Sequence, residues 1–206
     1  MLQGKEWIFF DLGSTLVDER EAYRQRILEM LAGTAISYDD FYNTMLGFYR
    51  QSQKGDKLAA ARYGLSLPEW KSEYEVLYPE ARMCLERLHK KYRLGIIANQ
   101  NPGTRERLRR FGIDGDFDVV IASAEEGMAK PDPCIFELAL NRSGCSADQA
   151  VMIGDRLDND IAPANRLGFT TVRILQGYGR YASPLLPDEI PDYTVSGLAD
   201  LCDILV

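Results

Sequence analysis

The feature that most constrains this chain is the segment 5–16, KEWIFFDLGSTL, in which an apolar run ends at an aspartate and a turn of small residues. The run Trp7 to Phe10 is apolar at every position, which is typical of a buried strand and not of an amphipathic helix. Ligands bind outside the carboxyl ends of strands in an open parallel sheet, and Asp11 follows such an end. The sequence therefore favours a strand that presents Asp11 to chemistry, although an aspartate there also serves as a turn or helix-capping residue.

The stretch that follows, residues 18–78, is expected to be helical throughout. Apolar residues recur with the helical period over residues 19–31 and 39–53, and shorter helices are expected at 56–63 and 68–77. A helical insertion between a first strand and the rest of a sheet predicts a separate small module over the strand edge. The aromatic side chains of this module follow the helix period, so we expect them mainly in its own core.

From residue 79 onward, short apolar segments alternate with helical ones. Strands are expected at 94–98, 119–122, 150–153 and 170–174, and helices at 80–91, 104–111, 133–142 and 159–167. This alternation predicts an α/β fold with a doubly wound parallel sheet. The predicted domains are a core from residues 1–17 and 79–206 and a helical domain from residues 18–78. The irregular loop 176–192 is expected at the surface.

Composition restricts the classes of partner. The chain has 206 residues and a net charge of −7, with 24 Lys and Arg against 31 Asp and Glu, so we expect no nucleic-acid partner. The basic run Arg105 to Arg110 has Glu106 interleaved and is expected to form a solvated helix face. Four isolated cysteines and a single histidine, His89, exclude zinc-site spacing and most histidine-activated nucleophiles.

Apolar segments are short throughout the sequence. None approaches membrane-spanning length, and the four-residue run near the N-terminus is too short for a signal-peptide core. We therefore expect no membrane partner and a cytoplasmic protein with reduced thiols. The pattern indicates no particular oligomeric state.

Polar residues follow the expected strands, and they converge because the carboxyl ends of parallel strands meet at one edge of the sheet. They are Asp11, Asn99, Lys130, Asp155 and Asp160. Two carboxylates on neighbouring strand ends repel each other unless a cation lies between them, and oxygen ligands of this kind suit Mg²⁺. Lys130 can neutralise Asp11 and meet a phosphate oxygen, while Asp160 can orient either metal-bound water or Lys130.

This set of motifs resembles the haloacid dehalogenase (HAD) superfamily, and in particular its phosphoglycolate phosphatase-like branch. The resemblance covers nearly the whole chain and rests on DLGSTL at 11–16, IIANQ at 96–100, KPDP at 130–133 and GDRLDND at 154–160. It implies a Rossmann-like α/β core with a small all-helical cap domain inserted after the first strand. It also implies a hydrolase, most often a phosphatase that acts on a small phosphorylated metabolite.

The resemblance further implies a role for each residue that matches a family motif. Asp11 is then the nucleophile that forms an aspartyl-phosphate, with Lys130 and Asp160 as the other catalytic residues. The implied ligands of a Mg²⁺ cofactor are Asp11, Gly13 through its backbone carbonyl, and Asp155. The implied substrate-binding residues are Asn99, Gln100 and Lys130.

Two positions depart from the family pattern. Phosphatases of the family carry a second aspartate two residues after the nucleophile as general acid and base, and here that residue is Gly13. The second motif ordinarily ends in Ser or Thr, and here it has Ala98. Because general acid-base catalysis contributes about 10²–10⁴-fold, we expect either a slow enzyme that prefers activated phosphates or a substitute acid. The candidates for that substitute are a cap residue, Ser14, Thr15 or Gln100.

Two alternatives stay open on the sequence alone. One is a catalytically degenerate scaffold of this family that acts as a binding protein. The other is a metal-independent 2-haloacid dehalogenase, which also lacks the second aspartate because a halide leaves without a proton. Asp155 in its Gly-Asp pair is costly without a metal, because it repels Asp11. The magnesium-dependent phosphatase is therefore the first hypothesis.

Overall fold

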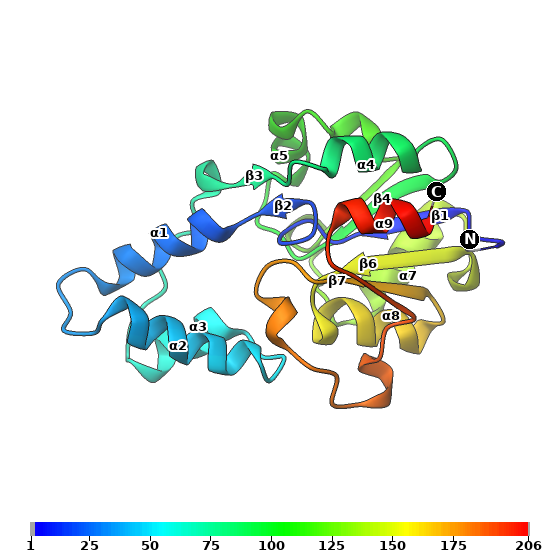
Figure 1. Ribbon diagram of the computed structural model, residues 1–206. Coiled ribbons are helices and arrows are strands. Elements are labelled where there is room, and N and C mark those ends of the chain that lie inside the picture. The colour runs from blue at the N-terminus through cyan, green and yellow to red at the C-terminus, as the bar shows by residue number, and fades with distance from the viewer. Residues whose placement is uncertain (1–2, 206) are drawn as a thin grey trace.

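The computed structural model describes residues 3–205, which form an α/β core with a helical projection (Figure 1). The elements, in chain order, are β1 (Trp7–Phe10), β2 (Val17–Asp18), α1 (Arg20–Leu31), α2 (Tyr38–Tyr49), α3 (Gly55–Arg62), β3 (Val76–Leu77), α4 (Ala81–Leu88), β4 (Arg93–Ala98), α5 (Thr104–Phe111), β5 (Val119–Ala122), α6 (Ser123–Glu126), α7 (Pro133–Ser143), β6 (Ala150–Gly154), α8 (Ala162–Leu167), β7 (Thr170–Ile174), β8 (Tyr193–Val195) and α9 (Leu198–Leu205). Short 3-10 turns and one π-helical turn, η4 (Leu157–Ile161), connect them.

The core sheet has six strands in the order β5-β4-β1-β6-β7-β8, and all of its pairings are parallel. Strand β1 lies in the middle, where Phe10 pairs with Ile96 of β4 and with Ile153 of β6. Asp11 therefore leaves the sheet between the ends of β4 and β6. The predicted doubly wound α/β class is confirmed. Because β4, β1 and β6 are neighbours in the sheet, the three motifs that follow them meet at one edge.

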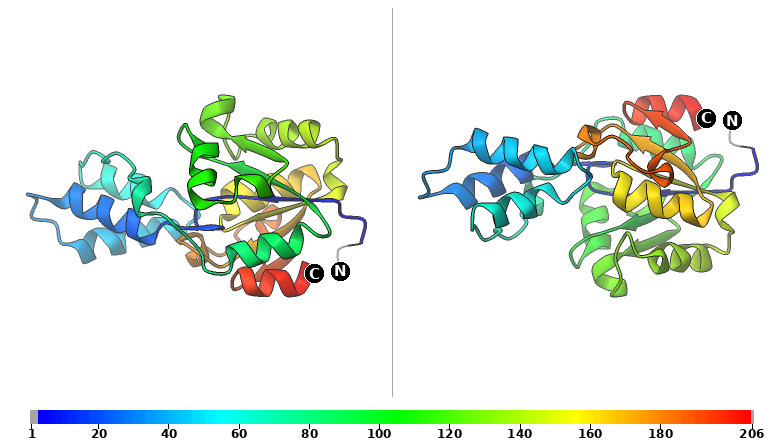
Figure 2. Two further views of the ribbon diagram at one scale, coloured as in Figure 1. Left: turned by 90° about the horizontal axis from the view of Figure 1, so that it is seen from above. Right: turned by 90° about the horizontal axis from the view of Figure 1, so that it is seen from below.

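A layer of helices covers each face of this sheet, as Figure 2 shows from two sides. Successive side chains of β1 point to opposite faces. Ile8 and Phe10 pack with α4, α5 and α9, whereas Trp7 and Phe9 pack with α7 and α8. Burial on both faces explains why the sequence of β1 is apolar without alternation.

Helices α1 to α3 project from the core beyond the carboxyl ends of the strands (Figures 1 and 2). Their buried side chains, among them Ile27, Phe41 and Met45, form a hydrophobic cluster separate from those of the sheet. Strands β2 and β3 pair antiparallel, with Val17 opposite Leu77, and connect the projecting helices to the core. The helical part therefore has its own core and a two-stranded attachment.

Three details of the secondary structure differ from the sequence-based expectation. The predicted helix at 68–77 is wrong, because this segment contains only a 3-10 turn, Ser72–Tyr74, before it pairs as β3 with β2. The segment is held instead by side chains, since the Trp70 indole donates to Glu75 Oε1 at 2.6 Å. Strand β8 and helix α9 were not predicted, because a three-residue strand gives almost no periodic signal.

The basic run on α5 is a solvated face only in part. Arg107 is buried and forms an ion pair with the buried Glu75, with Arg107 Nη2 2.6 Å from Glu75 Oε1. The pair anchors the segment before β3 to the core.

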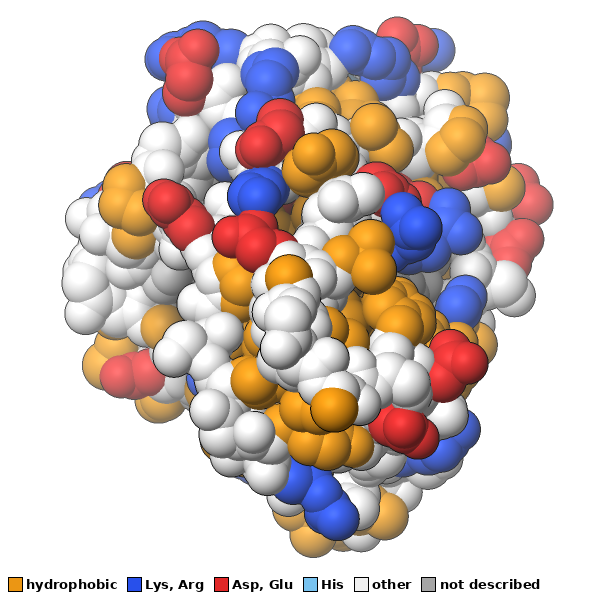
Figure 3. Space-filling model, turned by 90° about the vertical axis from the view of Figure 1, so that its left-hand side faces the viewer, with side chains coloured by type: hydrophobic (Ala, Val, Ile, Leu, Met, Phe, Trp, Pro, Cys, Tyr) orange, Lys and Arg blue, Asp and Glu red, His pale blue; other side chains and the backbone are white. Residues whose placement is uncertain are grey.

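Elsewhere the surface has charges of both signs, and on the face at the end of the helical projection acidic and basic side chains are interspersed (Figure 3). Among residues 3–205, no helix is long and apolar enough to cross a membrane.

Candidate active site

The residues that the sequence singled out line one cavity of about 150 Å³ at the carboxyl ends of β1, β4 and β6. They are Asp11, Gly13, Asn99, Gln100, Lys130, Asp155 and Asp160. Asp11 directly follows β1, Asn99 follows β4, and Asp155 follows β6. Their convergence is a consequence of the parallel sheet, since strand ends of one direction share one edge.

Lys130 bridges two carboxylates in this cavity. Its Nζ lies 2.7 Å from Asp11 Oδ1 and 2.5 Å from Asp160 Oδ1. Burial lowers the pKa of Lys130, but the charges of Asp11 and Asp160 raise it by more, so that the net shift is upward. Lys130 is therefore a fixed positive charge beside one oxygen of Asp11.

Asn99 holds the segment that carries Lys130. Its Oδ1 accepts the N–H of Lys130 at 2.8 Å, and its Nδ2 donates to the Lys130 carbonyl at 2.8 Å. Gln100 is also engaged, because its Oε1 accepts from the Arg107 guanidinium and its N–H donates to Ser123 Oγ at 3.0 Å. The strand-end amides thus fix the frame around Lys130.

Three carboxylates surround the remaining space. Asp11, Asp155 and Asp160 each have a carboxylate oxygen within 4.8 Å of the others. Burial, followed by the charges of Asp160 and Asp11, raises the pKa of Asp155 well above its usual value. Burial also raises the pKa of Asp160 to about 6, although Lys130 opposes this shift. Asp155 accepts the N–H of Gly179 at 3.1 Å and forms no ion pair within residues 3–205.

This donor set suits a divalent cation. Three buried or partly buried carboxylates face the ammonium group of Lys130. Arg156 also lines the cavity, but its guanidinium forms an ion pair with Asp158, so negative charge is in excess. Gly13, whose carbonyl is the third expected ligand, lines the same cavity as Asp11 and Asp155. Because Mg²⁺ prefers hard oxygen ligands, the residues present fit this ion.

The cavity also contains an acid that the sequence did not single out. Glu19, immediately before α1, lines the cavity, and Ser14 Oγ donates to Glu19 Oε2 at 3.0 Å. Burial, followed by the charges of Glu75 and Asp11, raises the pKa of Glu19 to about 8. The turn that brings Glu19 there depends on Ser14 at φ 58°, whose N–H donates to the Val17 carbonyl at 2.7 Å. No periodic pattern in the sequence marks such a turn. The sequence shows an acid, Glu19, eight positions after Asp11, but not that it returns to the site.

The irregular loop after β7 was expected to lie at the surface, but part of it packs against the helical part of the chain. Tyr178 packs among the aromatic side chains of the helical part, stacked on Tyr49 with ring centroids 5.1 Å apart. Its ring also meets Tyr23 edge-on at 4.9 Å. Tyr178 lines the 150 Å³ cavity, so this loop contributes to the site as well as to the contact between the two parts of the chain.

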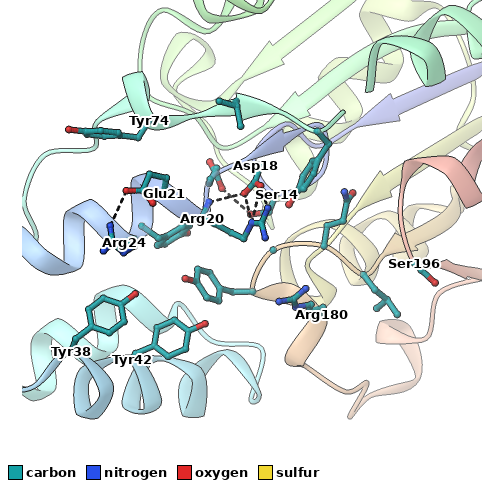
Figure 4. A pocket seen from close by; sticks show the side chains of 18 residues that line it. Ser14, Asp18, Arg20, Glu21, Arg24, Tyr38, Tyr42, Tyr74, Arg180 and Ser196 are labelled. Carbon is teal, nitrogen blue, oxygen red and sulfur yellow. Dashed lines mark hydrogen bonds and ion pairs between the residues drawn. The ribbon is translucent and has the colours of Figure 1, made fainter. Parts of the chain in front are cut away.

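Larger cavities adjoin the site on the side of the helical part. One of about 590 Å³ is shown in Figure 4, where Tyr38 and Tyr42 of α2 face Arg20 and Arg24 of α1 and Arg180 of the core. Another has a volume of about 420 Å³. Glu19 and Tyr23 line both of these cavities and the 150 Å³ cavity. Glu19 therefore stands between Asp11 and the space open to a larger molecule.

The chain is similar to known proteins in sequence and in fold. The family model described as haloacid dehalogenase-like hydrolase matches residues 5–168. Glyceraldehyde 3-phosphate phosphatase of Methanocaldococcus jannaschii is 32% identical over 96% of each chain. The protein of the same name from Pyrococcus furiosus is 34% identical over 96% of this chain and 92% of its own length. Among solved structures, a HAD phosphatase from Thermococcus onnurineus is 27% identical, with a TM-score of 0.69 and 97% coverage of each chain.

Proposed function

The chain belongs to the haloacid dehalogenase-like hydrolases, and from that premise we propose that it is a magnesium-dependent phosphatase of a small phosphorylated metabolite. The main supporting observation is Asp11, held by Lys130 at 2.7 Å within 4.8 Å of two further carboxylates. Relatives that are named glyceraldehyde 3-phosphate phosphatase favour a small sugar phosphate as substrate.

Asp11 is the proposed nucleophile. A carboxylate oxygen of Asp11 forms a bond to phosphorus while the ester P–O bond breaks, which leaves an aspartyl-phosphate and releases the alcohol. Water then attacks the phosphorus, the bond to Asp11 breaks, and inorganic phosphate leaves. Lys130 aligns the Asp11 carboxylate and stabilises the negative charge of the transferring phosphoryl group.

The other site residues support this chemistry from fixed positions. Asp11, Asp155 and the Gly13 carbonyl are the proposed ligands of Mg²⁺, which when bound reduces the repulsion between the phosphate and the carboxylates. Asp160 holds the ammonium group of Lys130. For Asn99 we propose a positioning role, because both polar atoms of its amide bond to the Lys130 backbone. Gln100 is proposed to contact the substrate.

The domain organisation belongs to the same proposal. Residues 1–17 and 79–206 form the catalytic core domain, and residues 18–78 form a cap domain. The cap contributes Tyr23, Tyr38 and Tyr42 to the cavities beside Asp11. Substrate selection is therefore assigned to the cap, and phosphoryl transfer to the core.

Dehalogenation and a binding role are the competing functions. A metal-independent dehalogenase would leave the buried Asp155 beside Asp11 and Asp160 with no ion-pair partner among residues 3–205, which is costly. A binding protein would not require Lys130 to be fixed between two carboxylates. Both observations favour the phosphatase.

Phosphate release from a panel of substrates tests the proposal. The panel contains glyceraldehyde 3-phosphate, glycerol phosphates, p-nitrophenyl phosphate and acetyl phosphate, each with Mg²⁺ and with a chelator. We expect release that requires Mg²⁺ and that disappears in Asp11→Asn. Release that persists in Asp11→Asn, or that is unaffected by the chelator, would contradict the proposal. Chloride release from 2-chloropropionate would favour the dehalogenase.

A further inference from the structure

The proposed reaction needs a proton donor and a proton acceptor that none of the assigned residues supplies. An alkoxide leaving group takes up a proton as its P–O bond breaks, and the attacking water loses one. Four carboxyl groups line the cavity, and three of them already have other roles: Asp11 as nucleophile, Asp155 as metal ligand, and Asp160 as the partner of Lys130. The fourth is Glu19.

The carboxyl group of Glu19 occupies the space beside Gly13. A Cβ atom built on Gly13 would lie 2.4 Å from Glu19 Oε1, 2.7 Å from Cδ and 2.8 Å from Oε2. Contacts this short do not occur, so a side chain at position 13 would displace the carboxyl group. The backbone of Gly13 is not in the left-handed region, so its conformation does not call for glycine. The Glu19 carboxyl group in its present position and a side chain at position 13 therefore exclude each other.

The carboxyl group is held but not neutralised. Ser14 Oγ donates to Oε2 at 3.0 Å, while Oε1, the atom nearest to Gly13, has no hydrogen-bond partner within the described part of the chain. Glu19 forms no ion pair with any residue from 3 to 205. One oxygen is thus fixed, and the other is free to meet a substrate or water.

We propose that Glu19 is the general acid and base of this enzyme, with its carboxyl group in the space that a side chain of residue 13 would occupy. The assignment rests on the proposed phosphatase function. It makes the acid a residue of the predicted cap domain, at the start of α1, although the nucleophile belongs to the core. Glu19 lines the 150 Å³ cavity and both larger ones, so it lies between Asp11 and the space for the leaving alcohol.

The proton balance of the two steps is closed by Glu19. In the first step an Asp11 oxygen bonds to phosphorus, the ester P–O bond breaks, and the proton of the Glu19 carboxyl passes to the leaving oxygen. In the second step the Glu19 carboxylate takes a proton from water as the water oxygen bonds to phosphorus. The bond between phosphorus and Asp11 then breaks, which regenerates Asp11 as a carboxylate and Glu19 as an acid.

The role of Glu19 is tested by measuring how the rate of Glu19→Gln depends on the leaving group of the substrate. This substitution keeps the size of the side chain but removes its proton-transfer group. For an alkyl phosphate such as glycerol phosphate, we expect kcat to fall by about 10²–10⁴-fold. With p-nitrophenyl phosphate, whose leaving group needs no proton, the variant should release one equivalent of nitrophenolate in a burst and then turn over slowly. The burst arises because the aspartyl-phosphate forms but lacks the base for its hydrolysis. Glu29→Gln, on the exposed side of α1, is the matched control and should behave like the wild type.

A second pair of variants tests the shared space directly. Gly13→Asp in the wild-type background places two carboxyl groups in one volume and should lower the rate. Gly13→Asp in a Glu19→Ala background should raise the rate on alkyl phosphates at least tenfold above that of Glu19→Ala alone. Circular dichroism and thermal melts of each variant separate a loss of folding from a loss of the acid.

The outcomes distinguish the two proposals. If the wild type hydrolyses alkyl phosphates and Asp11→Asn does not, the phosphatase stands. In that case Glu19→Gln with wild-type rates on alkyl phosphates would overturn the role of Glu19. An equal loss on alkyl and p-nitrophenyl phosphates without a burst would also overturn it. If the wild type releases no phosphate from any ester, the phosphatase fails and the role of Glu19 fails with it.

Discussion

Asp11 has two differently built sides. On the core side, Asp155 and Asp160 come from the end of β6 and the turn after it, and Lys130 comes from the loop between α6 and α7. Lys130 forms ion pairs with two carboxylates, those of Asp11 and Asp160. On the cap side, Glu19 and Tyr178 come from a tight turn and a long loop. The carboxyl group of Glu19 has one hydrogen bond and no ion pair within residues 3–205. The core side is fixed by compensated charge, whereas the cap side is placed by local backbone geometry and aromatic packing.

This difference suggests a division of labour. The core side has to hold strong charges in place before and after substrate binds, so it is built from a rigid parallel sheet. The cap side has to admit the substrate and exchange protons with it, and three cavities meet there at Glu19. Substitutions on the core side should therefore affect stability and metal binding, and substitutions on the cap side should mainly affect turnover.

The largest effect is expected from Lys130→Met. This change leaves Asp11 and Asp160 as neighbouring carboxylates without their shared cation, and breaking a buried ion pair in this way costs about 3–5 kcal/mol. Urea unfolding in the presence of a chelator measures the loss. Adding Asp160→Asn to Lys130→Met should restore part of the stability, because one of the two uncompensated charges is removed. A double variant as unstable as Lys130→Met alone would contradict the paired-charge account.

The next effect concerns the metal site. Mg²⁺ at about 100 times its dissociation constant should stabilise the wild type by about 2.7 kcal/mol. Asp155→Asn should lose most of this stabilisation, and with a chelator it should melt at or above the wild-type temperature, because it removes a buried like charge. Thermal melts with Mg²⁺ and with a chelator measure both the stabilisation by the metal and the stability without it. Equal stabilisation of the two proteins by Mg²⁺ would exclude Asp155 as a ligand.

A smaller effect is expected where the core loop meets the cap. Tyr178→Ala removes a ring that is stacked on Tyr49 and edge-on to Tyr23. The expected loss of stability is at least about 1 kcal/mol, since each of these two aromatic pairs contributes about 0.5–1.5 kcal/mol beyond its buried area. Tyr181→Ala in the same loop, whose ring meets only Arg180 among the described aromatic and cationic contacts, is the control and should cost less than about 0.5 kcal/mol. Similar losses in both variants would show that Tyr178 has no special part in joining the cap.

The smallest expected effect is that of Ser14→Gly. Glycine tolerates the φ of 58° at this position, so the turn is preserved while the hydrogen bond to Glu19 is lost. A single hydrogen bond contributes about 1 kcal/mol, which corresponds to a fall in kcat of about fivefold on alkyl phosphates. Steady-state kinetics measure it. Ser14→Gly in the Glu19→Gln background should have no further effect, and an additive loss would mean that Ser14 acts independently of Glu19.

The same contrast explains what the sequence alone could predict. Asp11, Asn99 and Asp155 could be singled out because each follows an apolar run, and parallel strands bring such ends together. Glu19 was missed because its position depends on one positive φ angle at Ser14, which leaves no periodic trace. The sequence did show that position 13 lacks an acid, but only the structure shows the Glu19 carboxyl group filling that space.

Long-range side-chain contacts likewise limited the prediction of secondary structure and burial from the sequence. The segment 68–77 was predicted as a helix from its residue pattern, but it is held by Glu75, which pairs with Arg107 of α5. Arg107 itself was expected to be solvated, because its neighbours in the sequence are charged. Neither residue shows its partner in the local pattern, since the two positions are 32 residues apart.

The covalent intermediate tests the account most directly. Glu19→Gln is mixed with p-nitrophenyl phosphate and Mg²⁺, quenched in acid, and the peptide that contains Asp11 is analysed by mass spectrometry. The account predicts one phosphoryl group on Asp11, at a higher occupancy than in the wild type, because the variant forms the aspartyl-phosphate but lacks the base that hydrolyses it. Phosphorylation of another residue, or nitrophenolate release with no phosphoryl group on Asp11, would contradict it.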